Sequence, residues 1–133
     1  MKYIKIYLTA LVVFLGIDAI WLTQISPSLY KHYIGFLLSD NPNLISALVF
    51  YLLYIAGLTY LVLAPAINKK SSKQAVFGGA VLGLVSYATY DLTNLAVIDK
   101  WPVAISLIDM AWGTILTATA SFITYKIIQK ISK

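Results

Sequence analysis

The sequence predicts an all-α integral membrane protein, a bundle of four spanning helices that takes up residues 1–133 as a single domain. Of its 133 residues, 60% are hydrophobic and only 11% are charged. A soluble domain normally carries about a quarter charged residues, and so small a globule could not bury the apolar excess. Four continuous apolar runs approach or exceed the roughly 20 residues that a spanning helix needs. These runs are 6–22, 44–66, 75–97 and 103–128.

The lysines predict how the bundle is oriented. All ten basic residues are lysines. On a path of four helices, Lys31 and Lys100 fall on one side and the remaining lysines on the other. Lys and Arg concentrate on the cytoplasmic side of membrane proteins, so we expect both termini to be cytoplasmic. The net charge of +5 then indicates topology and contact with anionic lipid, and not a nucleic-acid partner.

The first run is predicted to cross outward and to end before Ser26-Pro27. Beyond it, apolar side chains recur at helical spacing. Ser26 suits the N-cap position and Pro27 the first helical residue. We therefore expect a short amphipathic helix over residues 28–38, lying in the outer interface with its tyrosines toward the lipid. The residues on its apolar face are Tyr30, Tyr33, Ile34, Leu37 and Leu38.

The other helices follow from turn and loop signals. Asp40-Asn41-Pro42 is expected to cap the second helix, and Pro65 falls near the inner end of that helix, where a kink is least costly. A lysine-rich loop over residues 68–74 leads to the third helix. Asp99-Lys100-Trp101-Pro102 forms the outer turn into the fourth, with Trp101 as an interfacial anchor.

Three of the five acidic residues lie within spanning runs. Asp18 is four residues from the outer end of its run, while Asp91 and Asp109 are each six residues from the outer ends of theirs. A helix rises 1.5 Å per residue, so all three carboxyl groups fall at a similar depth in the outer third of the membrane. The sequence therefore predicts that they meet in one pocket.

Each of these acids has a hydrogen-bond donor three residues later, on the same helix face. The donors are Trp21, Asn94 and Trp112. No basic residue lies in a spanning run, so the acids must be protonated, hydrated or matched by a cation from outside the chain. With two tyrosines of the third helix, the predicted ligand-binding residues are Asp18, Trp21, Tyr87, Tyr90, Asp91, Asn94, Asp109 and Trp112.

The segments DAIWL, YDLTN and DMAWG carry a resemblance to a known family. In this order they resemble an uncharacterised family of small bacterial membrane proteins, classed as a domain of unknown function. The resemblance covers nearly the whole chain and implies four membrane helices in a bacterial inner (cytoplasmic) membrane; it implies no activity. The residues that carry it are Asp18, Trp21, Tyr90, Asp91, Thr93, Asn94, Asp109, Trp112 and Gly113.

These observations favour a protein that binds or transports a proton, a cation or a small cationic or amphipathic ligand, with the helix at 28–38 as a lid. A membrane-embedded enzyme acting on a lipid or isoprenoid is the first alternative, with an aspartate as general acid or base. If such an enzyme used a divalent metal, the ligands would come from Asp18, Asp91 and Asp109. Against it, no nucleophile–base pair and no phosphate-binding basic residue is in place. An accessory membrane subunit is the second alternative. The lipid bilayer is the expected partner, no cofactor is assigned, and a chain this small is compatible with a homo-oligomer.

Overall fold

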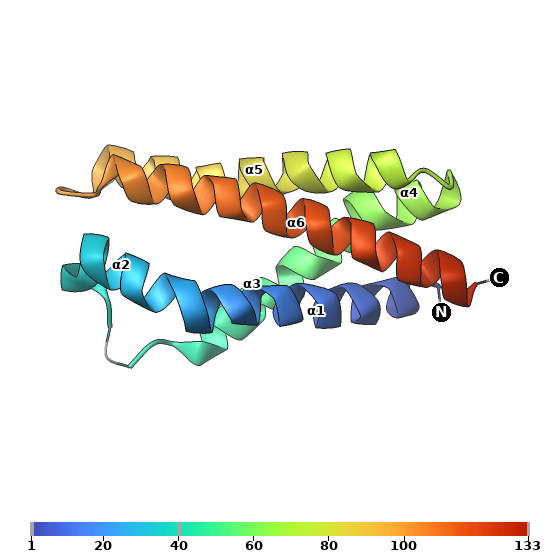
Figure 1. The fold of residues 1–133 in the computed structure, drawn as a ribbon, viewed down its shortest axis with the longest axis horizontal. Coiled ribbons are helices and arrows are strands. Elements are labelled where there is room, and N and C mark those ends of the chain that lie inside the picture. Colours follow the sequence, from blue (N-terminus) through green and yellow to red (C-terminus); the bar gives the residue numbers. More distant parts are fainter. Residues whose placement is uncertain (1, 40, 133) are drawn as a thin grey trace.

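The structure, a computed structural model, describes residues 2–39 and 41–132. Four helical runs in these ranges are long and apolar enough to cross a membrane. They pack lengthwise into a bundle (Figure 1), which confirms the predicted all-α, four-helix membrane fold. The runs are Lys2–Leu37, Leu44–Asn68, Ser72–Val97 and Val103–Ile131.

The sequence predicted that the first run ends before Ser26, but in the structure it continues past that residue. It consists of α1 (Lys2–Ile20), a π-helical turn η1 (Trp21–Ile25), α2 (Ser26–Ile34) and a short 3-10 turn η2 (Gly35–Leu37). The backbone N–H of Ser26 donates to the carbonyl of Trp21, five residues back, so Ser26 continues the helix and is not its N-cap. With 36 residues, the run is about 54 Å long. That length exceeds the roughly 30 Å hydrocarbon core, so α2 extends beyond it at the end of the bundle opposite the two termini, which is the predicted outer side.

The second run has the same construction. It comprises α3 (Leu44–Leu58), the π-helical turn η3 (Thr59–Leu63) and α4 (Ala64–Asn68). In both runs a proline, Pro27 or Pro65, is the second residue after the π turn. A proline has no N–H and its ring crowds the carbonyl four residues earlier. A wider turn just before it relieves that crowding, so each helix passes its proline without ending.

The cap of α3 differs from the predicted one. The side chain of Asn43 accepts a hydrogen bond from the backbone N–H of Ser46 at 3.0 Å. Asn43 thus satisfies one of the free N–H groups at the start of the helix. The predicted cap was Asp40-Asn41-Pro42, of which Asp40 lies outside the described residues.

The last two helices, α5 (Ser72–Val97) and α6 (Val103–Ile131), pack against each other more extensively than any other pair of helices in the bundle. They run antiparallel along one side of it (Figure 1). At Gly79, a Cβ atom would collide with Ser121, and at Gly83 with the backbone of Gly113. Glycines at these positions therefore allow the two backbones to approach closely, as small residues do in membrane helix pairs.

The start of α1 and the end of α6 lie at the same end of the bundle (Figure 1). The Lys2 ammonium group donates a hydrogen bond to the side chain of Asn68 there, linking α1 to α4. This common end agrees with an even number of spans. Its cytoplasmic location stays a prediction from the lysine distribution.

The buried apolar side chains of the described residues form three clusters, of which the smallest joins Ala66, Ala75 and Tyr125, and the other two lie on either side of the candidate site. The larger core fills the inner half, where Phe14 of α1 packs with Leu58 of α3 and Leu116 of α6. A smaller cluster lies at the outer end and contains Ile34 and Trp101. The candidate site lies between these two regions.

The outer cluster corrects two predictions. Ile34 packs against Trp101 and Ile105, with Tyr30 and Tyr33 beside them, so this face of α2 is turned toward α6 and not toward lipid. Trp101 is buried, and its indole N–H donates to the Ser106 hydroxyl at 3.0 Å. It is therefore a packing residue and not an interfacial anchor. An amphipathic stripe cannot distinguish lipid from a neighbouring helix, because both are apolar.

Candidate functional site

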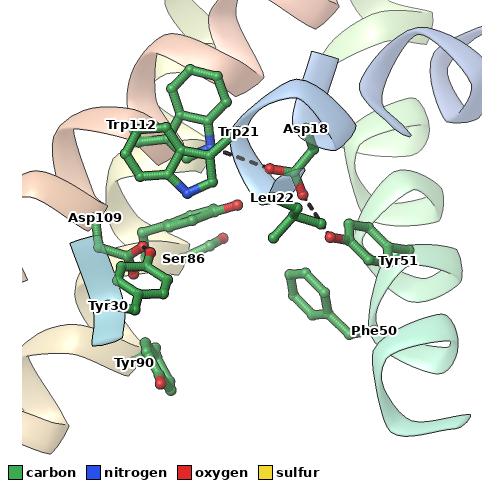
Figure 2. A pocket seen from close by; sticks show the side chains of 11 residues that line it. Asp18, Trp21, Leu22, Tyr30, Phe50, Tyr51, Ser86, Tyr90, Asp109 and Trp112 are labelled. Carbon is green, nitrogen blue, oxygen red and sulfur yellow. Dashed lines mark hydrogen bonds between the residues drawn. The ribbon is translucent and has the colours of Figure 1, made fainter. Parts of the chain in front are cut away.

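A cavity of about 560 Å³ lies in the outer half of the bundle, where all four runs contribute side chains. Its lining contains the carboxyl groups of Asp18 and Asp109 and two other non-aromatic side chains, those of Leu22 and Ser86. Every other lining residue is aromatic, and no lysine or histidine of the described chain is among them. The aromatic lining residues are Trp21, Tyr30, Phe50, Tyr51, Tyr87, Tyr90 and Trp112 (Figure 2).

Asp18 is held from two other helices. It is buried, and both of its carboxyl oxygens accept a hydrogen bond. The Tyr51 hydroxyl of α3 donates to Oδ2 at 2.5 Å, and the Trp112 indole of α6 donates to Oδ1 at 3.2 Å (Figure 2). Two donors compensate the loss of water around a buried carboxyl group and fix its orientation.

Trp112 was expected to serve the aspartate on its own helix, Asp109. Instead its indole stacks on that of Trp21, with ring centroids 4.6 Å apart and an interplanar angle of 9°. The stacked rings bridge α6 and η1, and the Trp112 N–H is directed across the interface to Asp18. The prediction that each tryptophan pairs with the acid three residues before it is therefore wrong: Trp112 bonds to Asp18, and the donors to Asp18 are Tyr51 and Trp112 and not Trp21.

Asp109 is buried on the opposite side of the cavity from Asp18 (Figure 2). Its Oδ1 accepts a hydrogen bond from the hydroxyl of Tyr30 on α2. Through this contact, α2 forms one side of the cavity. Tyr87 of α5 also lines the cavity, with its ring packed against Gly113 of α6.

Asp91 is fully buried and does not line the cavity. Among residues 2–39 and 41–132, no donor reaches either of its carboxyl oxygens. Asp91 lies on the face of α5 that packs against α6, where the Ser106 hydroxyl donates to its main-chain carbonyl at 2.9 Å. Asn94, the predicted companion of Asp91, does not bond to that carboxyl group and does not line the cavity either. The three acids therefore do not share one pocket as predicted: two line it, and the third lies behind Asp109.

The same placement bears on a metal site. Within the described parts of the chain, no three His, Cys, Asp or Glu side chains lie close enough together to hold a metal ion. Asp18 is separated from the other two acids by the cavity itself. A ligand set made of Asp18, Asp91 and Asp109 together is thus not formed in this structure.

Aromatic packing closes the cavity toward the inner half. Tyr54 and Thr117 share a hydrogen bond of 2.8 Å between their hydroxyl groups. The ring of Phe14 meets that of Tyr54 edge-on, with centroids 5.5 Å apart. Tyr54 also contacts Tyr87 edge-on at 6.5 Å. These rings separate the cavity from the inner core.

Several lining residues were not predicted, and one left a usable signal. Tyr51 lies seven residues after the outer start of its run, at nearly the depth calculated for Asp109. Depth alone could therefore have placed Tyr51 in the site. Tyr30 left no such signal, because its helix was expected to face lipid. The remaining lining residues outside the prediction are Leu22, Phe50 and Ser86.

Comparison with known proteins gives a family and no closer relative. No curated protein and no solved structure matches the chain. The family described as predicted membrane protein (DUF2177) matches residues 3–126, which include all four spans apart from Lys2 and residues 127–131. This protein, with its four membrane-spanning helices, belongs to the DUF2177 family.

Proposed function

We propose that this protein binds a small amphipathic organic cation in the cavity and carries it within the membrane. The observation that carries the proposal is the composition of the lining. Asp18 and Asp109 face a space whose other walls are almost wholly aromatic and contain no basic side chain in the described chain. Such a cavity offers negative charge in a poorly solvated setting, where electrostatic attraction is strong.

The aromatic rings support a cationic ligand in preference to a bare metal ion. Ring faces attract organic cations, and the attraction is greatest where water is excluded. The cavity volume of about 560 Å³ lies within the range of sites for drug-sized molecules. Because Asp18 and Asp109 lie on opposite sides (Figure 2), a cation between them would contact either carboxyl group and several rings at once.

The rim of the cavity supports entry from the bilayer. Phe50 of α3 and Tyr90 of α5 both line the cavity, yet 45% and 57% of their surfaces are exposed. Their exposed surfaces lie on spanning helices and would therefore face lipid. A ligand with an apolar body would reach the cavity between these two side chains without crossing water.

Binding of tetraphenylphosphonium, a delocalised organic cation, tests the proposal. Titration calorimetry on the purified, detergent-solubilised protein should give saturable binding. Asp18→Asn and Asp109→Asn should each weaken it by about tenfold or more, equivalent to about 1.4 kcal/mol. Neutral triphenylphosphine oxide should bind far more weakly than the cation.

Asp99→Asn is the matched control, because Asp99 is an exposed aspartate of the outer turn. This variant should bind the cation as the unmodified protein does. Circular dichroism and gel filtration establish that each variant is folded. Equal affinity in all three folded variants, or no saturable binding to the unmodified protein, would refute the proposed function.

A further inference from the structure

Asp91 has no role in the cavity described above, yet its environment is unusual. Its carboxyl group is fully buried in the membrane-spanning part of α5. No donor of the described chain reaches either oxygen. The Ser106 hydroxyl bonds to the main-chain carbonyl of Asp91 at 2.9 Å and not to its carboxyl group. A carboxylate left in this state would be costly, because buried polar groups need hydrogen-bond partners.

The antiparallel register of α5 and α6 sets Gly79 against Ser121 and Tyr87 against Gly113. Continued by one more turn, this register sets Asp91 against a second carboxyl group, that of Asp109 on α6. Two carboxylates repel each other because both are negatively charged. Since both can only accept hydrogen bonds, neither can satisfy the lone pairs of the other. One proton between them supplies an O–H donor and removes one of the two charges. The other ionisable groups that line the cavity beside Asp109 are the hydroxyls of Tyr30, Tyr51, Tyr87 and Tyr90, with the Asp18 carboxyl group on the opposite side. None of these groups is a cation that could take the place of the proton.

We propose that Asp91 and Asp109 share a single proton, and that an organic cation entering the cavity displaces it. This inference rests on the proposed function. Before binding, the pair carries one proton and one negative charge. A cation beside Asp109 compensates a second negative charge, so the proton leaves through the cavity and both acids become carboxylates. One positive charge enters and one leaves, so the protein exchanges a proton for its ligand.

Asp109 and Asp91 differ in their contact with the cavity, and we assign them different roles for that reason. Asp109 lines the cavity and accepts from Tyr30, so it is the member that contacts the ligand. Asp91 lies behind it, out of contact with the cavity. Asp91 therefore acts as a positioning residue that holds the proton against Asp109. Asp18 differs from Asp91 in that both of its oxygens accept a hydrogen bond, from Tyr51 and Trp112.

Infrared spectroscopy tests the shared proton without any ligand. The ligand-free protein at neutral pH should show the C=O stretch of a protonated carboxyl group, and Asp91→Asn should remove it. Asp109→Asn should shift the frequency of that band, since the hydrogen-bond partner of Asp91 changes. Asp18→Asn and Asp99→Asn should leave it unaltered. Absence of the band in the unmodified protein, or its persistence in folded Asp91→Asn, would overturn the shared proton.

Calorimetry in two buffers tests the exchange. Binding of tetraphenylphosphonium is measured in phosphate and in Tris, whose ionisation enthalpies differ, and the difference gives the number of protons released. We expect about one proton per bound cation for the unmodified protein and for Asp99→Asn, and close to none for Asp91→Asn. Binding without proton release would overturn the exchange alone. No binding, together with the expected infrared result, would overturn the proposed function and leave the shared proton standing.

Discussion

Trp112 of α6 donates its indole N–H to Asp18 of α1 at 3.2 Å, across the interface between the two helices. The ring that makes this bond is also stacked on Trp21, three residues after Asp18. Two D-x-x-W segments, one in each helix, are thus joined by a hydrogen bond and a stacked pair at the level of the cavity. These two contacts hold α1 against α6 beside the cavity.

Replacing Trp112 by Phe should show what the hydrogen bond contributes. A phenyl ring still stacks on Trp21 but has no N–H, so Asp18 keeps only its bond from Tyr51. The free energy of unfolding should fall by about 0.6 to 2 kcal/mol, the range for hydrogen bonds between membrane helices. Reversible unfolding in mixed micelles measures it. In a double-mutant cycle with Asp18→Ala, which removes the acceptor oxygen, the two losses should not add; strict additivity would mean that the bond contributes nothing.

Tyr30 should control how firmly α2 closes the outer side of the cavity. Tyr30→Phe removes the hydroxyl that bonds to Asp109, so hydrogen exchange of the backbone amides in α2 should become faster. Exchange monitored by mass spectrometry measures this directly. Tyr33→Phe on the same helix is the control, because the Tyr33 ring packs edge-on against His32. Equal acceleration in both variants would show that the Asp109 contact does not hold α2.

Gly113 should resist enlargement. A Cβ atom at this position would overlap the ring of Tyr87, so Gly113→Ala must push that ring into the cavity. We expect a loss of about 1–3 kcal/mol in unfolding free energy, with weaker binding of tetraphenylphosphonium. Gly57→Ala is the matched control, since nothing lies within 4 Å of a Cβ atom there. It should be neutral or stabilising by up to about 1 kcal/mol, because alanine favours helix more than glycine does. Similar stabilities for the two variants would contradict the close contact at Gly113.

The orientation in the membrane can be tested directly, because the chain contains no cysteine. Single cysteines at exposed positions, Asp99→Cys in the outer turn and Ser132→Cys after α6, should react differently with a membrane-impermeant maleimide. In intact cells only the first should be labelled, and both after permeabilisation, as the lysine distribution requires. Leu53→Cys, whose position is exposed on α3 and should face lipid, should remain unlabelled throughout. The reverse pattern would invert the topology.

The four spans and the depth of the acids could be inferred from the sequence. Each depends on local properties: apolar length, lysine positions and a fixed rise per residue. The prediction that the first helix ends before Ser26 was wrong, because a π turn before Pro27 absorbs the proline within one helix. Periodicity could not reveal that outcome, since a helix that ends at a proline and one that passes it share the same pattern.

Partnerships between helices were beyond the reach of these local signals. Depth places Asp18, Asp91 and Asp109 at one level, but it does not say how far each helix is rotated about its own axis. That rotation turns Asp18 and Asp109 into the cavity, leaves Asp91 buried behind Asp109, and directs the Trp112 N–H to α1. Rotation is fixed by how side chains from all four spans fit together. The amino-acid order therefore specifies which residues reach a given depth, while contacts between distant segments select which of them meet.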